Sequence, residues 1–199
     1  MRRLERALNK HGFDTVNVVY PSHTLAIRSL AKMAIESGLE ACHKKGAASI
    51  HFVTHSLGGI LVHQYTQQTS IEGLQKIVML GPPNQGSEVV DRLKKLAGFK
   101  IVNGPTAVEL GTNEHDLPLY LGPVNFELGV IAGTRSVNPI LSTLIPERND
   151  GKVAVEKTKI EGMKDFIDLP VSHPFMMRNP EVIRQTIYIL ERGEFGHVD

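Results

Sequence analysis

Ser56 is the residue whose surroundings most clearly point to chemistry. It lies in the run IHFVTHSLGG at positions 50–59, where a strand-like apolar stretch meets a helix-like stretch. A sharp turn between a strand and a helix holds a serine hydroxyl above the carboxyl edge of a sheet, in strained backbone geometry. Gly58 provides the small residue that such a turn needs two positions later, whereas the larger Thr54 stands two positions before. We therefore interpret Ser56 as a nucleophile, with Thr54, His55 and Gly58 as parts of its turn.

Leu57 begins the helix expected after this turn. The amino end of a helix carries partial positive charge, and the Leu57 amide is placed to donate one hydrogen bond to a developing oxyanion. The alternative is an ordinary strand–turn–helix in which Ser56 only caps the helix.

The elements around Ser56 alternate between strand and helix. β-branched and apolar runs predict strands at residues 14–20, 48–54, 74–80, 125–133 and 166–171. Apolar residues at helical spacing predict helices at residues 2–10, 24–45 (capped by Thr24), 57–69, 87–96 and 179–192. Residues 97–123 lack a clean period and predict loops with short helices. This alternation predicts an α/β fold: one domain over residues 1–199, with a mostly parallel sheet covered by helices on both faces.

The composition narrows the function classes. Lys and Arg number 22 against 21 Asp and Glu, and this balance argues against a nucleic-acid binder or a polybasic membrane anchor. No stretch approaches the ~20 apolar residues of a membrane span. Cys42 is the only cysteine, so neither an internal disulfide nor a cysteine-based zinc site can form. The amino-terminal residues MRRLER lack a signal-peptide pattern, which taken at face value predicts a cytoplasmic protein.

The serine run, together with the loop MLGPPNQGS at positions 79–87, resembles the lipase/esterase branch of the α/β-hydrolase superfamily. The nearest likeness is to small bacterial lipases without a large cap domain. The loop is similar to an LGTPxxGS-like loop of lipases and inositol-deacylase-like proteins. The resemblance covers nearly the whole chain and implies a three-layer α/β-hydrolase fold. It also implies a Ser-His-Asp triad acting through an acyl-enzyme, without a metal or an organic cofactor. In that fold the nucleophile, the acid and the histidine follow one another in this order along the chain.

His173 is the histidine that this order favours as the general base. Of the nine histidines, only His115, His173 and His197 lie well beyond the serine turn. His173 follows the last expected strand and precedes the final helix, and the run VSHPFM resembles the histidine loop of lipases. His115 comes before the strand that should precede the acid, and His197 lies in the terminal tail. His51 and His63, near the turn, are interpreted as packing or surface residues rather than metal ligands.

Asp150 is the expected acid. It lies in the loop RNDGKV, which resembles the Asp-Gly-x-Val loop that carries the acid of the triad. A plain Asp-Gly turn is the alternative, because both residues favour turns. Asp165 and Asp168 lie too close to the last strand, and Glu156 is held in reserve.

One part of the family pattern has no match. The resemblance implies a second oxyanion amide from a loop, usually containing His-Gly, that follows an earlier central strand. Here the chain begins at the helix that should follow that strand, and His11-Gly12 comes after the helix. We expect an N-terminally short sheet. Either the natural protein starts further upstream, which we favour, or a shortened chain folds with weak or no activity.

Three functions remain open. The first is hydrolysis of carboxylic esters, with a small-molecule acyl ester or a lipid as substrate. The second is acyl transfer or thioester hydrolysis by the same triad. The third is a pseudo-hydrolase that keeps the fold as a binding module.

Overall fold

A computed structural model describes residues 1–22, 24–87, 89–91, 109–112, 117–137, 145 and 147–197. Outside these residues lie most of the helix expected at 87–96 and most of the irregular stretch 97–123. His115 lies outside them as well.

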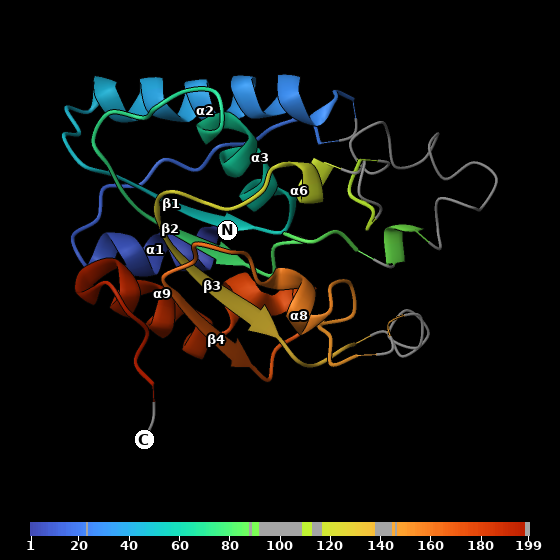
Figure 1. Ribbon diagram of the computed structural model, residues 1–199. Coiled ribbons are helices and arrows are strands. Elements are labelled where there is room, and N and C mark those ends of the chain that lie inside the picture. Colours follow the sequence, from blue (N-terminus) through green and yellow to red (C-terminus); the bar gives the residue numbers. More distant parts are fainter. Residues whose placement is uncertain are drawn as a thin grey trace.

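A parallel sheet of four strands forms the centre of the described fold. The strands are β1 (Ile50–His55), β2 (Leu74–Leu80), β3 (Glu127–Gly133) and β4 (Asp165–Leu169), and each pairs in parallel with the next (Figure 1). In β2, Ile77 and Met79 enter one core, whereas Val78 and Leu80 enter another. This alternation buries both faces of the sheet, as a parallel sheet requires.

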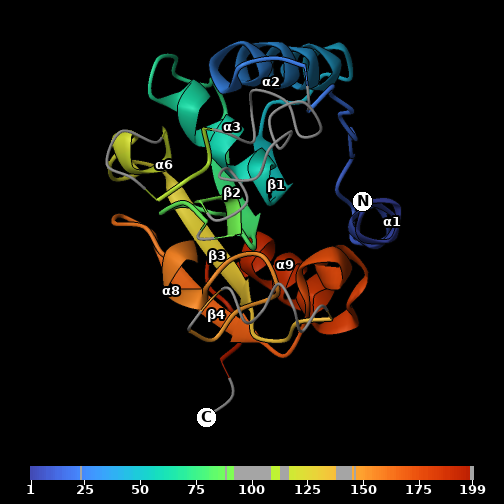
Figure 2. The same ribbon diagram turned by 90° about the vertical axis from the view of Figure 1, so that its right-hand side faces the viewer.

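Helices cover both faces. On one face lie α2 (Ile27–Lys44), α3 (Leu57–Thr66) and the short α6 (Leu117–Tyr120). On the other lie α1 (Arg2–Lys10) and α9 (Pro180–Arg192) (Figure 2). The short α8 (Val155–Thr158) and the 3-10 helix η1 (His173–Arg178) lie in the connections around β4. The expected three-layer α/β architecture is confirmed.

Helix α9 shows how local sequence sets an element's bounds. The Asn179 side chain accepts hydrogen bonds from the backbone N–H groups of Glu181 and Val182, and Pro180 takes the first helical position. Gly193 ends the helix in left-handed geometry, with φ of 86°.

Two expectations about the amino-terminal part are wrong. Residues 14–20 form no strand, because no described strand lies within hydrogen-bonding reach of them to complete a ladder. Helix α2 begins at Ile27 after Ala26, not after Thr24, whose hydroxyl instead donates to the carbonyl of Pro21.

Candidate active site

Ser56 lies on a strained turn between β1 and α3. Its φ of 55° and ψ of −124° make it the only non-glycine residue with positive φ in the described part of the chain. Its N–H donates to the carbonyl of Leu80 at 2.9 Å, which fastens the turn to β2. A Cβ at Gly58 would lie 3.3 Å from Cβ of Thr54, so the glycine makes room for the larger residue at the other side of the turn. The strained geometry expected from the sequence is present.

A hydrogen-bonded chain joins Ser56, His173 and Asp150. The Ser56 Oγ lies 2.9 Å from His173 Nε2, and His173 Nδ1 lies 2.6 Å from Asp150 Oδ2. An ionised carboxylate only accepts, so His173 donates through Nδ1 and presents Nε2 as the acceptor for the serine hydroxyl. The structure thus brings together three side chains from distant parts of the sequence in one hydrogen-bonded chain.

The Asp150 carboxylate is buried and accepts several hydrogen bonds. Its side chain is 1% exposed, and Oδ1 accepts the N–H groups of Lys152 and Val153, both at 2.9 Å. With His173 this gives the carboxylate three donors, which offset the cost of burying its charge. The Asp150 carbonyl also accepts the N–H of His173 at 3.0 Å, so the acid loop fixes both the ring and the backbone of the histidine.

His55 supports His173 from the strand side. Its Nε2 lies 3.0 Å from the carbonyl oxygen of His173, and the two rings lie 4.7 Å apart between centroids. Burial, reinforced by the nearby His173, lowers the pKa of His55 to about 4. A neutral His55 therefore donates to the His173 backbone without adding a second positive charge beside it.

The loop after β2 holds the acid loop in place. Asn84 Nδ2 donates to the carbonyl of Thr158 at 2.8 Å, and Ser87 Oγ donates to that of Lys152 at 2.8 Å. The resemblance drew attention to residues 79–87, and their contacts give them a physical role: they clamp the segment that carries Asp150.

Two glycines near the hydrogen-bonded chain were not predicted. A Cβ at Gly81, where φ is 55°, would lie 3.0 Å from Asp150 Oδ2 and 3.2 Å from His173 Nδ1. A Cβ at Gly133 would lie 2.7 Å from Cβ of Asp150. Both residues stand at carboxyl ends of strands, Gly81 just after β2 and Gly133 at the end of β3. That position is the one signal in the sequence that could have marked them.

The other acidic residues considered from the sequence, and His197 among the other histidines, contact different partners. Asp168 pairs with Arg148 at 2.7 Å, and Glu156 pairs with Lys159 at 2.9 Å. Asp165 accepts from the Phe195 N–H and lies 3.0 Å from His197 Nε2. Asp165 begins β4, so this last pair lies at the opposite edge of the sheet from Ser56.

The Leu57 amide lies in the first turn of α3, where backbone N–H groups have no partner within the helix. It is available beside Ser56 as one donor to a developing negative charge.

A cavity of about 500 Å³ lies close by, but on the far side of the turn. Thr54, His55 and Gly58 line it, whereas Ser56 and His173 do not. It is therefore not the place where a substrate would meet the serine hydroxyl.

Within the described ranges, no three His, Cys, Asp or Glu side chains gather as a metal ion would need. No helix in these ranges has the length and apolar character to cross a membrane.

No protein-family model matches the chain, and no curated protein sequence matches it. Solved structures do match its fold. The mature lipase BlEst2 of Bacillus licheniformis aligns with a TM-score of 0.67 at 13% identity, over 94% of this chain and 81% of that one. The phospholipase PlaB of Legionella pneumophila, in complex with thio-NAD, aligns with a TM-score of 0.72 at 14% identity, over 95% of this chain and 54% of PlaB.

An esterase of Thermogutta terrifontis aligns with a TM-score of 0.53 at 13% identity, over 96% of this chain and 84% of the esterase. The chain thus has the α/β-hydrolase fold, as the resemblance implied, and it spans about half the length of PlaB.

Proposed function

We propose that this protein is a serine hydrolase that cleaves carboxylic esters, with Ser56 as nucleophile, His173 as general base and Asp150 as the orienting acid. The observation that carries the proposal is the unbroken hydrogen-bonded chain from Ser56 Oγ through His173 to Asp150, with contacts of 2.9 and 2.6 Å. A serine hydroxyl is a weak nucleophile until a base removes its proton, and this chain supplies that base in the correct tautomer.

The first half of the reaction forms an acyl-enzyme. His173 Nε2 takes the Ser56 proton while Oγ attacks the ester carbonyl carbon, and the Leu57 N–H donates to the resulting oxyanion. Asp150 stabilises the imidazolium that forms. The carbon–oxygen bond to the alcohol then breaks, the alcohol oxygen takes the proton from His173, and the acyl group remains on Ser56.

The second half repeats these steps with water. His173 removes a proton from water, the hydroxide attacks the acyl carbon, and the bond to Ser56 breaks. Ser56 Oγ recovers its proton from His173, and the carboxylic acid leaves. In this scheme His173 carries each proton between Ser56, the departing alcohol and water.

Acyl or lipid esters are the proposed substrate class. The matching structures come from a lipase, a phospholipase and an esterase, all at low sequence identity, so the fold supports the reaction class and not a chain length. We also propose, from the near-balanced charge, that nucleic acid is not a partner.

The test is hydrolysis of p-nitrophenyl esters with short, medium and long acyl chains. We expect turnover by the unaltered protein, and a loss of roughly 10³-fold or more in kcat for Ser56→Ala, because the nucleophile is removed. Thr69→Ala, a hydroxyl removed from the exposed end of the connection after α3, is the matched control and should keep full activity. Equal rates for Ser56→Ala and the unaltered protein would contradict the proposal.

Acyl transfer or thioester hydrolysis would use the same three residues. Adding an alcohol acceptor, and replacing the oxygen ester by a thioester, separates these reactions through the products formed. A folded protein that turns over none of these substrates would instead favour the pseudo-hydrolase.

A further inference from the structure

His173 meets Ser56 across two intervening strands. The histidine follows β4 and the serine follows β1, with β2 and β3 between them in the sheet. At ~4.8 Å between neighbouring strands, the carboxyl ends of β1 and β4 are roughly 14 Å apart. The segment after β4 must therefore carry His173 back over the sheet and hold it there, because a misplacement of about 1 Å between reacting groups can cost roughly 10²-fold in rate.

Two hydrogen bonds fasten His173 to the acid loop. Asp150 Oδ2 lies 2.6 Å from the ring Nδ1, and the Asp150 carbonyl accepts the His173 N–H at 3.0 Å. Two residues earlier, the Val171 carbonyl accepts the N–H of Arg135, which follows β3, at 3.2 Å. These bonds fix the histidine relative to β3 and β4. They do not fix it relative to the turn that carries Ser56.

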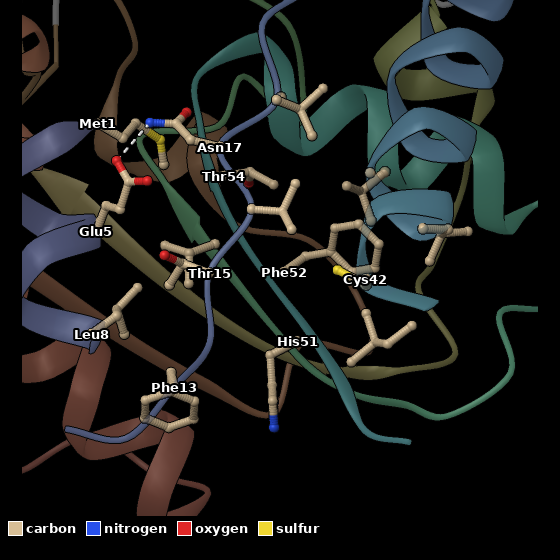
Figure 3. A pocket seen from close by; sticks show the side chains of 18 of the residues that line it. Met1, Glu5, Leu8, Phe13, Thr15, Asn17, Cys42, His51, Phe52 and Thr54 are labelled. Atoms are coloured by element: carbon tan, nitrogen blue, oxygen red, sulfur yellow. Dashed lines mark hydrogen bonds between the residues drawn. The ribbon is translucent and has the colours of Figure 1, made fainter. Parts of the chain in front are cut away.

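Only two hydrogen bonds of the described chain join residues 50–66 to η1, and both go to His173. One is the bond between Ser56 Oγ and Nε2, which the proposed reaction breaks and remakes. The other runs from His55 Nε2 to the His173 carbonyl oxygen, at 3.0 Å. The outer edge of β1 borders the cavity of about 500 Å³ (Figure 3), so no described strand holds the turn from that side.

The His55 ring is suited to a fixed hydrogen bond and not to proton transfer. A carbonyl oxygen only accepts, so Nε2 carries the proton and Nδ1 of the neutral ring has none. The charges that act on this ring are those of His173, Asp150 and Lys152. Burial, reinforced by His173, lowers the pKa of His55 to about 4, so the ring is neutral near pH 7. A neutral donor can keep its bond while His173 gains and loses a proton.

We propose that His55 is a positioning residue whose bond to the His173 carbonyl sets the distance between Ser56 Oγ and His173 Nε2. His55 and Ser56 are consecutive, so this bond ties the base to the same turn that carries the nucleophile. The acid loop orients the imidazole ring, and His55 fixes its approach to the serine. The effect on catalysis rests on the proposed function, whereas the contact itself can be measured in the resting protein.

Three substitutions separate the hydrogen bond from the bulk of the ring. Gln carries an N–H at the reach of histidine Nε2, Asn carries one only at the reach of Nδ1, and Leu has similar bulk without a donor. The first readout is the nitrogen-15 chemical shift of His173 Nε2 at pH 8, which depends on whether Ser56 donates to that nitrogen. Ser56→Ala gives the value without the bond. We expect His55→Leu and His55→Asn to move at least half-way to that value, and His55→Gln to stay near the unaltered protein.

The second readout is the rate at which a fluorophosphonate labels Ser56. We expect labelling to slow roughly 10- to 100-fold in His55→Leu and His55→Asn, and less than about threefold in His55→Gln. Val53→Ala is the matched control, because Val53 lies two residues earlier on the same face of β1 and packs against the core that contains Met176 of η1. It should lower the Tm and leave both readouts unchanged.

An unchanged Nε2 shift in His55→Leu would overturn the proposal. An equal shift in Val53→Ala would do so as well, because the effect would then come from packing. The proposal also fails if His55→Gln does not restore what His55→Asn loses, and this comparison decides alone should His55→Leu not fold. Absence of labelling in the unaltered protein would instead contradict the proposed function, and the Nε2 shift would still test the contact.

Discussion

At the scale of single residues, the buried carboxylate of Asp150 sets the geometry of the site. Its two oxygens have separate tasks: Oδ1 accepts two backbone N–H groups of its own loop, and Oδ2 accepts from His173. The loop therefore holds the carboxylate rigidly, and the carboxylate in turn holds the imidazole with Nε2 facing Ser56.

Asp150→Asn tests this division of tasks. The amide can still accept from the loop, but its NH₂ group facing His173 Nδ1 favours the wrong tautomer. We expect kcat for ester hydrolysis to fall roughly 10³- to 10⁴-fold, with a much smaller change in KM. Asp168→Asn, which removes the exposed partner of Arg148, is the matched control and should change kcat less than about twofold. Similar kcat values for the two variants would exclude Asp150 from this role.

Gly81→Ala separates backbone strain from interference with the site. Alanine at φ of 55° costs about 1–2 kcal/mol, and its Cβ would also press on Asp150 Oδ2. Gly122 has a similar φ of 67° but open space around it, so Gly122→Ala carries the strain alone. We expect both variants to lose stability in urea unfolding, but only Gly81→Ala to lose ester hydrolysis by tenfold or more. Full activity in folded Gly81→Ala would show that the glycine is not needed there.

At the scale of elements, the sequence predicts the helices and strands whose bounds depend on residues close together in the chain. The β-branched runs mark β2, β3 and β4 to within a few residues, and Asn179 and Gly193 mark the ends of α9. Residues 14–20 carry an equally strong strand pattern, but a strand also requires a neighbour to pair with, and the cavity of about 500 Å³ separates them from β1. Likewise, the need for glycine at positions 81 and 133 comes from Asp150 and His173, which approach from distant loops. No local sequence pattern reveals such contacts.

The helix after Ser56 carries a titratable side chain in its buried face. His63 is 1% exposed, and its Nε2 accepts a hydrogen bond from the Gln67 side-chain amide at 3.1 Å, which requires the neutral ring. Burial lowers the pKa of His63 to about 4. The unfolded chain therefore takes up a proton near pH 6.5, while the folded chain resists it until about pH 4.

His63→Gln should reduce the acid sensitivity of the fold. In the unaltered protein, His63 contributes stability that is fully present above about pH 6.5 and is lost as pH falls towards 4, up to about 3 kcal/mol. His55 contributes in the same direction, since its pKa is also lowered to about 4. Urea unfolding between pH 7 and 4 should thus show a shallower loss for His63→Gln.

Val62→Ala, next to His63 on the same helix, is the control for the pH series. It removes a buried side chain and should lower the free energy of unfolding by a similar amount at every pH. If His63→Gln and Val62→Ala both kept the full pH dependence, His63 would not be its source.

At the scale of the whole molecule, the parallel sheet is what assembles the site. Ser56 and His173 are 117 residues apart, and each follows the carboxyl end of a strand. Because β1 to β4 all run in one direction, these ends share one edge of the sheet, where the Asp150 loop meets them. The order serine, acid, histidine could be taken from the family resemblance, but the distances between them depend on packing across the whole fold. The cavity of about 500 Å³ lies at the other side of β1, and neither Ser56 nor His173 lines it.

The most direct test of the account is covalent labelling of Ser56. A fluorophosphonate reacts with a serine only when a base activates it, and the phosphonate then stays on Oγ. We predict one phosphonate per folded chain, located at Ser56 by peptide mass spectrometry, absent in Ser56→Ala and at least 100-fold slower in His173→Ala. A folded chain that remains unlabelled, or is labelled at a residue other than Ser56, would contradict the assignment of Ser56 as the nucleophile.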